Sequence, residues 1–130
     1  MGVDIRIRTD RSKTQAGLSI SLSDDGYYWF LHPLFQQLRD ESGKYVDLYG
    51  DAFFTREDYP RLRRLLDEAN EMARRQPSAW EVQVGTQLRP TRKEIYGTVQ
   101  RDNLFKIITT LRKIVDLADE LDGVLECTGD

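Results

Sequence analysis

The chain has little of two residues that often serve catalysis, metal binding and covalent cross-linking. Cys127 is its only cysteine and His32 its only histidine among 130 residues. A single cysteine excludes an internal disulfide, which fits a reducing compartment. A zinc site would need ligands from this histidine, this cysteine and carboxylates, an unusual set for that metal. We therefore expect no metal and no cofactor.

Long apolar runs and an excess of positive charge are also missing. No apolar stretch approaches the roughly 20 residues that span a bilayer, and the polar start MGVDIRIRTD lacks the apolar segment of a signal peptide. The formal net charge is -3, whereas nucleic-acid binding needs clustered Lys and Arg. We expect a cytoplasmic protein that binds neither membrane nor nucleic acid, and whose partner is a basic protein.

The composition is that of a folded protein, with 39% hydrophobic and 32% charged residues. The length favours one compact domain over residues 1–130. Strict alternation of apolar and polar residues predicts two opening strands, on Val3, Ile5 and Ile7 and then on Leu18, Ile20 and Leu22.

Helical spacing of apolar residues predicts three helices, over 27–41, 55–75 and 102–121. Proline is comfortable only in the first turn of a helix. Because Pro33 lies inside the first predicted helix, that helix either begins near His32 or is kinked there. In the second helix, Thr55 and Asp58 have the spacing of a capping box with Asp in place of the usual Glu.

Three further strands are expected, over 45–49, 80–88 and 124–128, with a bulge at Gly85 in the middle one. The segment 89–100 fits both a capped turn and an extension of the sheet, and stays open. The predicted fold is α+β. A single antiparallel or mixed sheet of about five strands packs against three helices in the order β-β-α-β-α-β-α-β.

Aromatic residues are concentrated in one quarter of the chain. Ten of the thirteen fall between Tyr27 and Tyr59. In the predicted strand over 45–49, Tyr45, Asp47 and Tyr49 share the face opposite the apolar residues. Two aromatic rings beside a carboxylate suit a sugar, a base or an arginine side chain of a partner. Ordinary packing beneath a helix is the competing interpretation.

The other side chains that could act in catalysis or metal binding have simpler structural interpretations. No recognised catalytic spacing joins His32 to an acid, and Cys127 falls in a short apolar strand, so we expect structural roles for both. Asp24 and Asp25 suit a helix N-terminus, and Asp51 suits a turn after glycine. None of these residues forms a specific catalytic motif.

The C-terminal segment carries a segregated charge. Residues 114–130 contain six acids and no Lys or Arg, so they contribute -6 while the other 113 residues sum to +3. Four of these acids lie near the end of the last predicted helix, where the helix dipole favours cations. An interaction patch and simple solubility both explain such a run. The four acids are Asp116, Asp119, Glu120 and Asp122.

Size, charge and the lack of catalytic motifs favour a non-enzymatic protein-binding domain, such as an immunity protein that neutralises a basic bacterial toxin or enzyme. Its expected contacts are the four helix acids, or else Tyr45, Asp47 and Tyr49. The alternative is a small-molecule-binding protein or small hydrolase that uses the aromatic and acidic block 24–58. The oligomeric state is left open.

Overall fold

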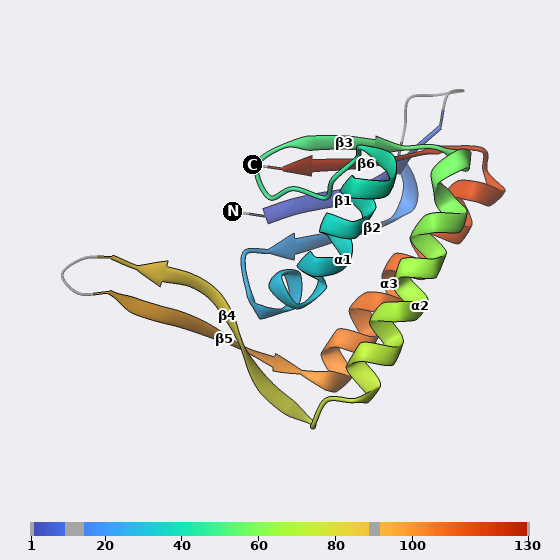
Figure 1. Cartoon of the computed structure of the whole chain (residues 1–130). Coiled ribbons are helices and arrows are strands. Elements are labelled where there is room, and N and C mark those ends of the chain that lie inside the picture. The colour runs from blue at the N-terminus through green and yellow to red at the C-terminus, as the bar shows by residue number, and fades with distance from the viewer. Residues whose placement is uncertain (1, 10–14, 89–91, 130) are drawn as a thin grey trace.

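The structure is a computed structural model that describes residues 2–9, 15–88 and 92–129. Its helices and strands confirm the α+β class, but the described residues form six strands in two antiparallel sheets instead of about five in one (Figure 1). The elements in chain order are β1 (Gly2–Arg8), β2 (Gln15–Ser23), α1 (Gly26–Ser42), β3 (Asp51–Phe54), the 3-10 turn η1 (Arg56–Asp58), α2 (Tyr59–Arg74), β4 (Ala79–Gln87), β5 (Lys93–Gln100), α3 (Arg101–Glu120) and β6 (Val124–Gly129).

The main sheet has the strand order β2-β1-β6-β3, so the first and last strands of the chain pair at its centre. Alternate residues of these strands are buried, because helices cover one face of the sheet. The predicted apolar face of β1 supplies this core, as do Leu22 of β2 and Cys127 of β6, which is 1% exposed. The other two residues of the predicted β2 face are less covered, because Ile20 is partly buried and Leu18 is exposed. Burial, with a smaller effect of the Glu126 charge, raises the pKa of the Cys127 thiol to about 12, which suits its expected core role.

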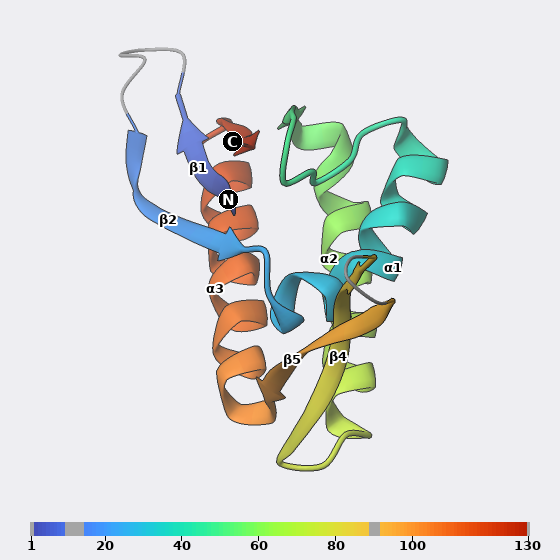
Figure 2. The same ribbon diagram turned by 90° about the vertical axis from the view of Figure 1, so that its left-hand side faces the viewer.

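The strand predicted over 80–88 does not join the main sheet. As β4 it pairs with β5, which arises from the segment left open, and the hairpin extends away from the main sheet (Figure 2). A register irregularity between Gln83 and Gly85 matches the predicted bulge. The hairpin packs closely on the start of α1. A Cβ atom on Gly97 of β5 would lie only 3.1 Å from the backbone nitrogen of Gly26.

Helix α1 begins earlier than either Pro33 or His32. The carboxylate of Asp25 caps it by accepting the N–H groups of Tyr27 and Tyr28 at 3.0 and 3.3 Å. A start near His32 is therefore wrong, and Pro33 lies in the helix interior. The cap and the burial of the first two turns stabilise this arrangement although proline removes one helical N–H donor.

The strand predicted over 45–49 is also wrong, because that segment is irregular and ends in a turn ahead of β3. The two apolar side chains predicted to be buried there are buried. The backbone groups of this segment bond to side chains and not to a neighbouring strand. The hydroxyl of Tyr28 donates to the carbonyl of Val46 at 2.7 Å, and the carboxylate of Asp47 accepts the N–H of Tyr49 at 3.0 Å. Such side-chain hydrogen bonds compete with strand pairing.

Asp58 joins the start of α2 to the segment after α1. Its carboxylate accepts the N–H of Thr55 at 2.9 Å, as the predicted capping box requires, and pairs with Lys44 at 2.5 Å. The side chain is 8% exposed. Burial favours the neutral acid, but the hydrogen bonds from Lys44 and Thr55 outweigh it and hold the pKa of Asp58 below its ordinary value. The ammonium of Lys44 is therefore already matched by a carboxylate.

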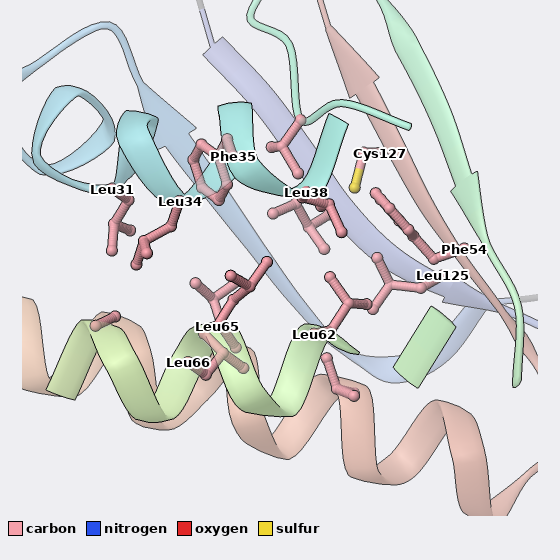
Figure 3. A pocket seen from close by; sticks show the side chains of 15 residues that line it. Leu31, Leu34, Phe35, Leu38, Phe54, Leu62, Leu65, Leu66, Leu125 and Cys127 are labelled. Atoms are coloured by element: carbon pink, nitrogen blue, oxygen red, sulfur yellow. The ribbon is translucent and has the colours of Figure 1, made fainter. Parts of the chain in front are cut away.

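A small cavity lies between α1, α2 and the sheet (Figure 3). Its volume is about 50 Å³ and all of its lining side chains are apolar. Such cavities stay dry, and this one costs about 1 kcal/mol of stability at the usual penalty per unit of cavity volume. It offers no polar group for orienting a ligand.

Candidate functional site

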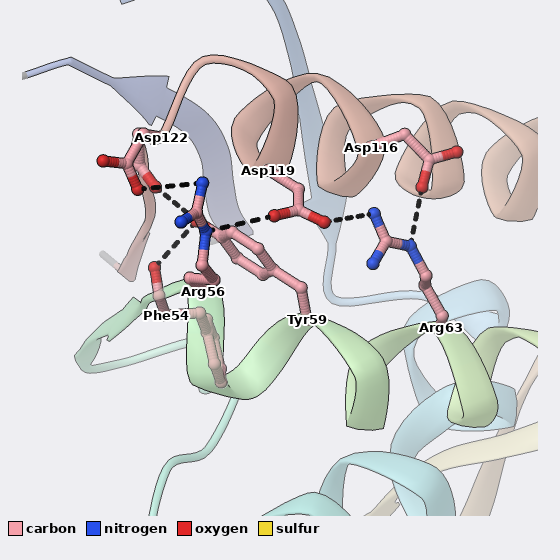
Figure 4. Close-up of polar contacts among 8 residues, drawn as sticks. Phe54, Arg56, Tyr59, Arg63, Asp116, Asp119 and Asp122 are labelled. Atoms are coloured by element: carbon pink, nitrogen blue, oxygen red, sulfur yellow. Dashed lines mark hydrogen bonds and ion pairs between the residues drawn. The ribbon is translucent and has the colours of Figure 1, made fainter.

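Three of the four predicted helix acids face arginines of the neighbouring segment η1 and α2 (Figure 4). Arg63 contacts Asp116 and Asp119, each at 2.8 Å. Arg56 approaches Asp119 at 3.6 Å and Asp122 at 3.5 Å. These three acids and two arginines form the α3 ion-pair row. Each of its acids has an arginine partner, so the three acids do not form a bare negative patch, although the row keeps one net negative charge.

The α3 ion-pair row resolves the conflict between the acids and the helix dipole. Cations are favoured near a helix C-terminus, and here a neighbouring helix supplies them. Beneath the row, buried Tyr59 donates its hydroxyl to the carbonyl of Gly123 at 2.5 Å. Burial raises the pKa of Tyr59 to about 12. Glu120 stays exposed and forms no ion pair with the described residues.

Tyr45 is held from the side of α1. Its hydroxyl lies 2.6 Å from Nε2 of His32 and 3.4 Å from the hydroxyl of Tyr28. Burial lowers the pKa of His32, so the ring is neutral at pH 7 and Nε2 can accept the tyrosine proton. The guanidinium of Arg39 lies 5.7 Å from the centre of the Tyr45 ring. Tyr45 is thus held in place by hydrogen bonds, and Arg39 of the same chain already lies against its ring.

An open groove of about 470 Å³ lies beside β3, and Tyr45, Asp47, Asp51 and Phe53 are among the residues that line it. Tyr49 lies in the turn ahead of β3. The side chains of Tyr49 and Phe53 are 59% and 50% exposed, large values for aromatic residues. The carboxylates of Asp47 and Asp51 form no ion pair with another described residue. We call Asp47, Tyr49, Asp51 and Phe53 the β3-edge surface.

Strand alternation brings two of these residues to the surface. In β3, Asp51 and Phe53 point outward while the residues between and after them are buried. Sequence reasoning treated Asp51 as a turn residue and did not single out Phe53. The alternation in 51–54 was the signal that would have found them. Of the predicted trio, Asp47 and Tyr45 line the groove, and Tyr49 is exposed in the adjoining turn.

The turn that carries Asp47 and Tyr49 rests on the end of β6. The N–H of Gly129 donates to the carbonyl of Gly50 at 2.9 Å. A Cβ atom on Gly129 would lie 2.5 Å from the nitrogen of Gly50 and 2.6 Å from the carbonyl oxygen of Asp47. Only glycine permits this approach, which places the turn beside the sheet edge.

Comparison of the chain with protein-family models, with curated proteins and with solved structures found no match. Within the described ranges, no three His, Cys, Asp or Glu side chains gather as a potential metal site. No helix in that part of the chain is long and apolar enough to cross a membrane. The candidate functional sites are therefore the β3-edge surface and the α3 ion-pair row.

Proposed function

We propose that this chain is a non-enzymatic protein-binding domain that holds a basic partner protein through the β3-edge surface. In this proposal the chain acts as a cytoplasmic immunity protein that neutralises a bacterial toxin or enzyme. The observation that carries the proposal is the pairing of two exposed aromatic rings, Tyr49 and Phe53, with two carboxylates that have no cation partner among the described residues.

This combination suits arginine and lysine side chains of a partner. A guanidinium is attracted both to aromatic faces and to carboxylates, with which it forms strong charge-assisted hydrogen bonds. Exposed aromatic residues are common energetic anchors at protein interfaces, and complementary charge speeds encounter. Asp47 and Asp51 would supply the charge, and Tyr49 and Phe53 the anchors.

The acids of α3 are weaker candidates for partner contacts than the β3-edge surface. A cationic partner that binds Asp116, Asp119 or Asp122 has to share these acids with Arg56 and Arg63. An acid that already has an ion-pair partner gains less from a second cation. Glu120 is the exception, but a single exposed carboxylate contributes little to binding.

The groove also supports the small-molecule alternative. Its volume lies within the range of about 300–1,000 Å³ that is usual for ligand sites, and it falls inside the block 24–58. A thermal-shift screen with nucleotides, sugars and divalent ions separates the two functions. A ligand at a hundred times its dissociation constant adds about 2.7 kcal/mol to stability. The protein-binding proposal predicts no shift with any of them, and a clear shift favours the alternative.

The direct test uses the tagged chain as bait in a lysate of its native organism. We expect a basic protein to be retained at low salt and released at high salt, because ionic strength screens exposed charge. The double variant Y49A/F53A is expected to lose this protein. The matched control is Y96A, since Tyr96 is equally exposed at 50% but lies on β5. Retention by Y49A/F53A equal to that by Y96A would contradict the proposal.

A further inference from the structure

The main sheet has an open edge at β3, beside the groove. In the described structure β3 pairs only with β6, so its other side has no neighbouring strand (Figure 1). Residues of two stretches, 43–47 and 51–53, line the groove, and none of the described residues that line it belongs to β6. The groove therefore borders the free side of β3. Its other wall is the segment that follows α1.

The backbone groups on this free side belong to Asp51 and Phe53. Successive residues of an antiparallel strand turn their N–H and C=O groups alternately toward one neighbour and the other. The carbonyl of Gly50 accepts the N–H of Gly129 at 2.9 Å, so Gly50 faces the end of β6. The alternation gives Ala52 the same direction. It leaves the N–H and C=O groups of Asp51 and Phe53 directed away from β6.

A buried tyrosine supports this alternation at the other end of β3. The hydroxyl of Tyr59 lies 3.2 Å from the carbonyl oxygen of Phe54 and 2.5 Å from that of Gly123, which directly precedes β6. The carbonyl of Phe54 therefore points to the β6 side. Because Phe53 is the neighbouring residue, its own N–H and C=O groups point to the opposite side.

The charge of the groove favours a basic strand on this edge. Asp47 and Asp51 lie on its two walls, and their carboxylates form no ion pair with another described residue. Lys44 also lines the groove, but it is already paired with Asp58. An incoming arginine or lysine is therefore complementary to the edge. A second copy of the chain is not, because pairing β3 with β3 brings the same acids of both copies together.

We propose that the basic partner adds an extended segment to the free edge of β3, antiparallel, with an arginine or lysine opposite Asp51. This inference rests on the proposed function and specifies how the partner is held. Antiparallel addition continues the main sheet, in which all neighbouring strands are antiparallel. The facing residue bonds to the N–H and C=O groups of Asp51, and its side chain lies beside the carboxylate. The residue two positions along lies opposite Phe53.

Hydrogen exchange in the free chain tests the direction of the backbone groups. We expect the amide protons of Asp51 and Phe53 to exchange at least about tenfold faster than those of Ala52 and Phe54, which bond to β6. NMR follows the four amides one by one. Equal rates, or the opposite order, would leave no free donors on this edge and would overturn the proposal.

Binding is tested with the capped peptide Thr-Arg-Thr-Arg-Thr-Arg-Thr, which is basic and favours an extended backbone. NMR titration should shift the amide signals of Asp51 and Phe53. Two derivatives of equal charge carry the same number of N-methyl groups, on the arginines or on the threonines. An arginine opposite Asp51 donates its own N–H to β3. The arginine-methylated peptide should therefore bind at least about tenfold more weakly than the threonine-methylated one.

The charge is tested with the unmethylated peptide. D51N should bind it several-fold more weakly than the wild type, because the facing arginine loses its carboxylate. The matched control is E120Q, which removes the same charge from an exposed residue on α3 that has no ion pair with the described residues. Equal weakening in D51N and E120Q would overturn the proposed register.

The outcomes separate this inference from the proposed function. Equal affinities of the two methylated peptides, their reverse order, or no shift at Asp51 and Phe53 would overturn strand addition. The proposed function would still stand if Y49A/F53A lost the retained basic protein. Shifts of these two amides with the concentration of the free chain would show that a second copy occupies the edge, which would also overturn the inference. A bait that retains no basic protein contradicts the proposed function itself.

Discussion

Two groups of acids in this molecule differ in what surrounds them. The three acids of the α3 ion-pair row face arginines at 2.8–3.6 Å. The two acids of the β3-edge surface have two exposed aromatic side chains nearby and no ion pair within the described residues. The acids near the C-terminus are the more conspicuous group in the sequence. The two acids of the β3-edge surface are nevertheless more available to a partner. Charge that is segregated along a chain need not be segregated in space.

The cause of the difference is the position of the cations. Arg63 comes from α2, which packs against α3, and Arg56 comes from η1, which directly precedes α2. Two cations lie near the groove beside β3. The ammonium of Lys44 is held by buried Asp58 at 2.5 Å, and the guanidinium of Arg39 lies against the ring of Tyr45. The Lys44–Asp58 pair therefore keeps a positive charge from Asp47 and Asp51. The comparison can be tested by changing each set of contacts separately.

The largest effect is expected from G129A, which should disturb the β3-edge surface and leave the α3 ion-pair row intact. The new Cβ atom would lie within 2.7 Å of three backbone atoms of the 47–50 turn, so the turn has to move. We expect a loss of about 3 kcal/mol in the free energy of unfolding. Chemical denaturation measures it.

The matched control for this change is G85A. A Cβ atom on Gly85 would have no neighbour within 4 Å, and this glycine also lies in a strand. G85A should unfold within about 0.5 kcal/mol of the wild type. Equal losses for the two variants would show that the close approach of Gly129 does not hold the turn.

D58N should have the next largest effect, about 2 kcal/mol, because it removes a buried charged hydrogen-bond partner of Lys44. The folded-state pKa of Asp58 is below its ordinary 3.8. Its contribution to stability is therefore present above that pH and is lost as pH falls through the lowered pKa. The difference in stability between D58N and the wild type should shrink in strong acid, measured by thermal unfolding against pH. A difference that does not change with pH would contradict this assignment.

D58N also tests whether the charge of the β3-edge surface governs partner binding. It frees the ammonium of Lys44 beside the groove, where it can approach the carboxylates of the β3-edge surface. We therefore expect weaker retention of a basic partner, tested at a temperature where the variant is fully folded. Unchanged retention would mean that the charge of this surface does not govern binding.

R63A should cost about 1 kcal/mol, because it leaves Asp116 and Asp119 without their nearest cation on a partly exposed surface. The loss should shrink as salt is added, since salt screens both the pairs and the repulsion left behind. R75A is the control, as Arg75 has no ion pair among the described residues. Partner retention should not fall in R63A, and a marked fall would show that the α3 ion-pair row is part of the binding site.

The smallest effect concerns His32 and is a dependence on pH. Burial lowers its pKa in the folded protein from 6.5, so the unfolded chain takes up the proton first. Stability should therefore be full above about 6.5 and fall as pH decreases toward the lowered pKa. H32Q should lose this part of the pH dependence. Unfolding curves of both proteins between pH 7 and pH 5 check it, and parallel curves would contradict the assignment.

Sequence patterns predicted the parts of the fold that depend on local periodicity. The opening strands, the three helices and the buried Cys127 follow from the spacing of apolar residues. The strand over 45–49 failed for a non-local reason, because a tyrosine hydroxyl from α1 takes the carbonyl of Val46. The separate β4–β5 hairpin was missed because no local signal specifies which strands pair.

The predicted contact residues stay a prediction, and the structure shows only where they lie. Asp47 and Tyr49 were expected in a strand and lie in an irregular segment and turn, where Tyr49 is exposed and Asp47 is partly buried. Asp51 was interpreted as a turn residue and Phe53 was not singled out, because the alternation in 51–54 was not interpreted as a strand. The pairing of Asp116 with Arg63 could not be anticipated, since the two residues are 53 positions apart and meet only through helix packing.

We propose that the β3-edge surface, and not the α3 ion-pair row, holds a basic partner. Two variants test it with the same loss of charge, D47N/D51N and D116N/D119N. We would measure the affinity of each for the retained partner at low salt. We expect at least tenfold weaker binding for D47N/D51N and less than about threefold for D116N/D119N, since Asp116 and Asp119 already have arginine partners. The reverse order of the two losses would contradict it.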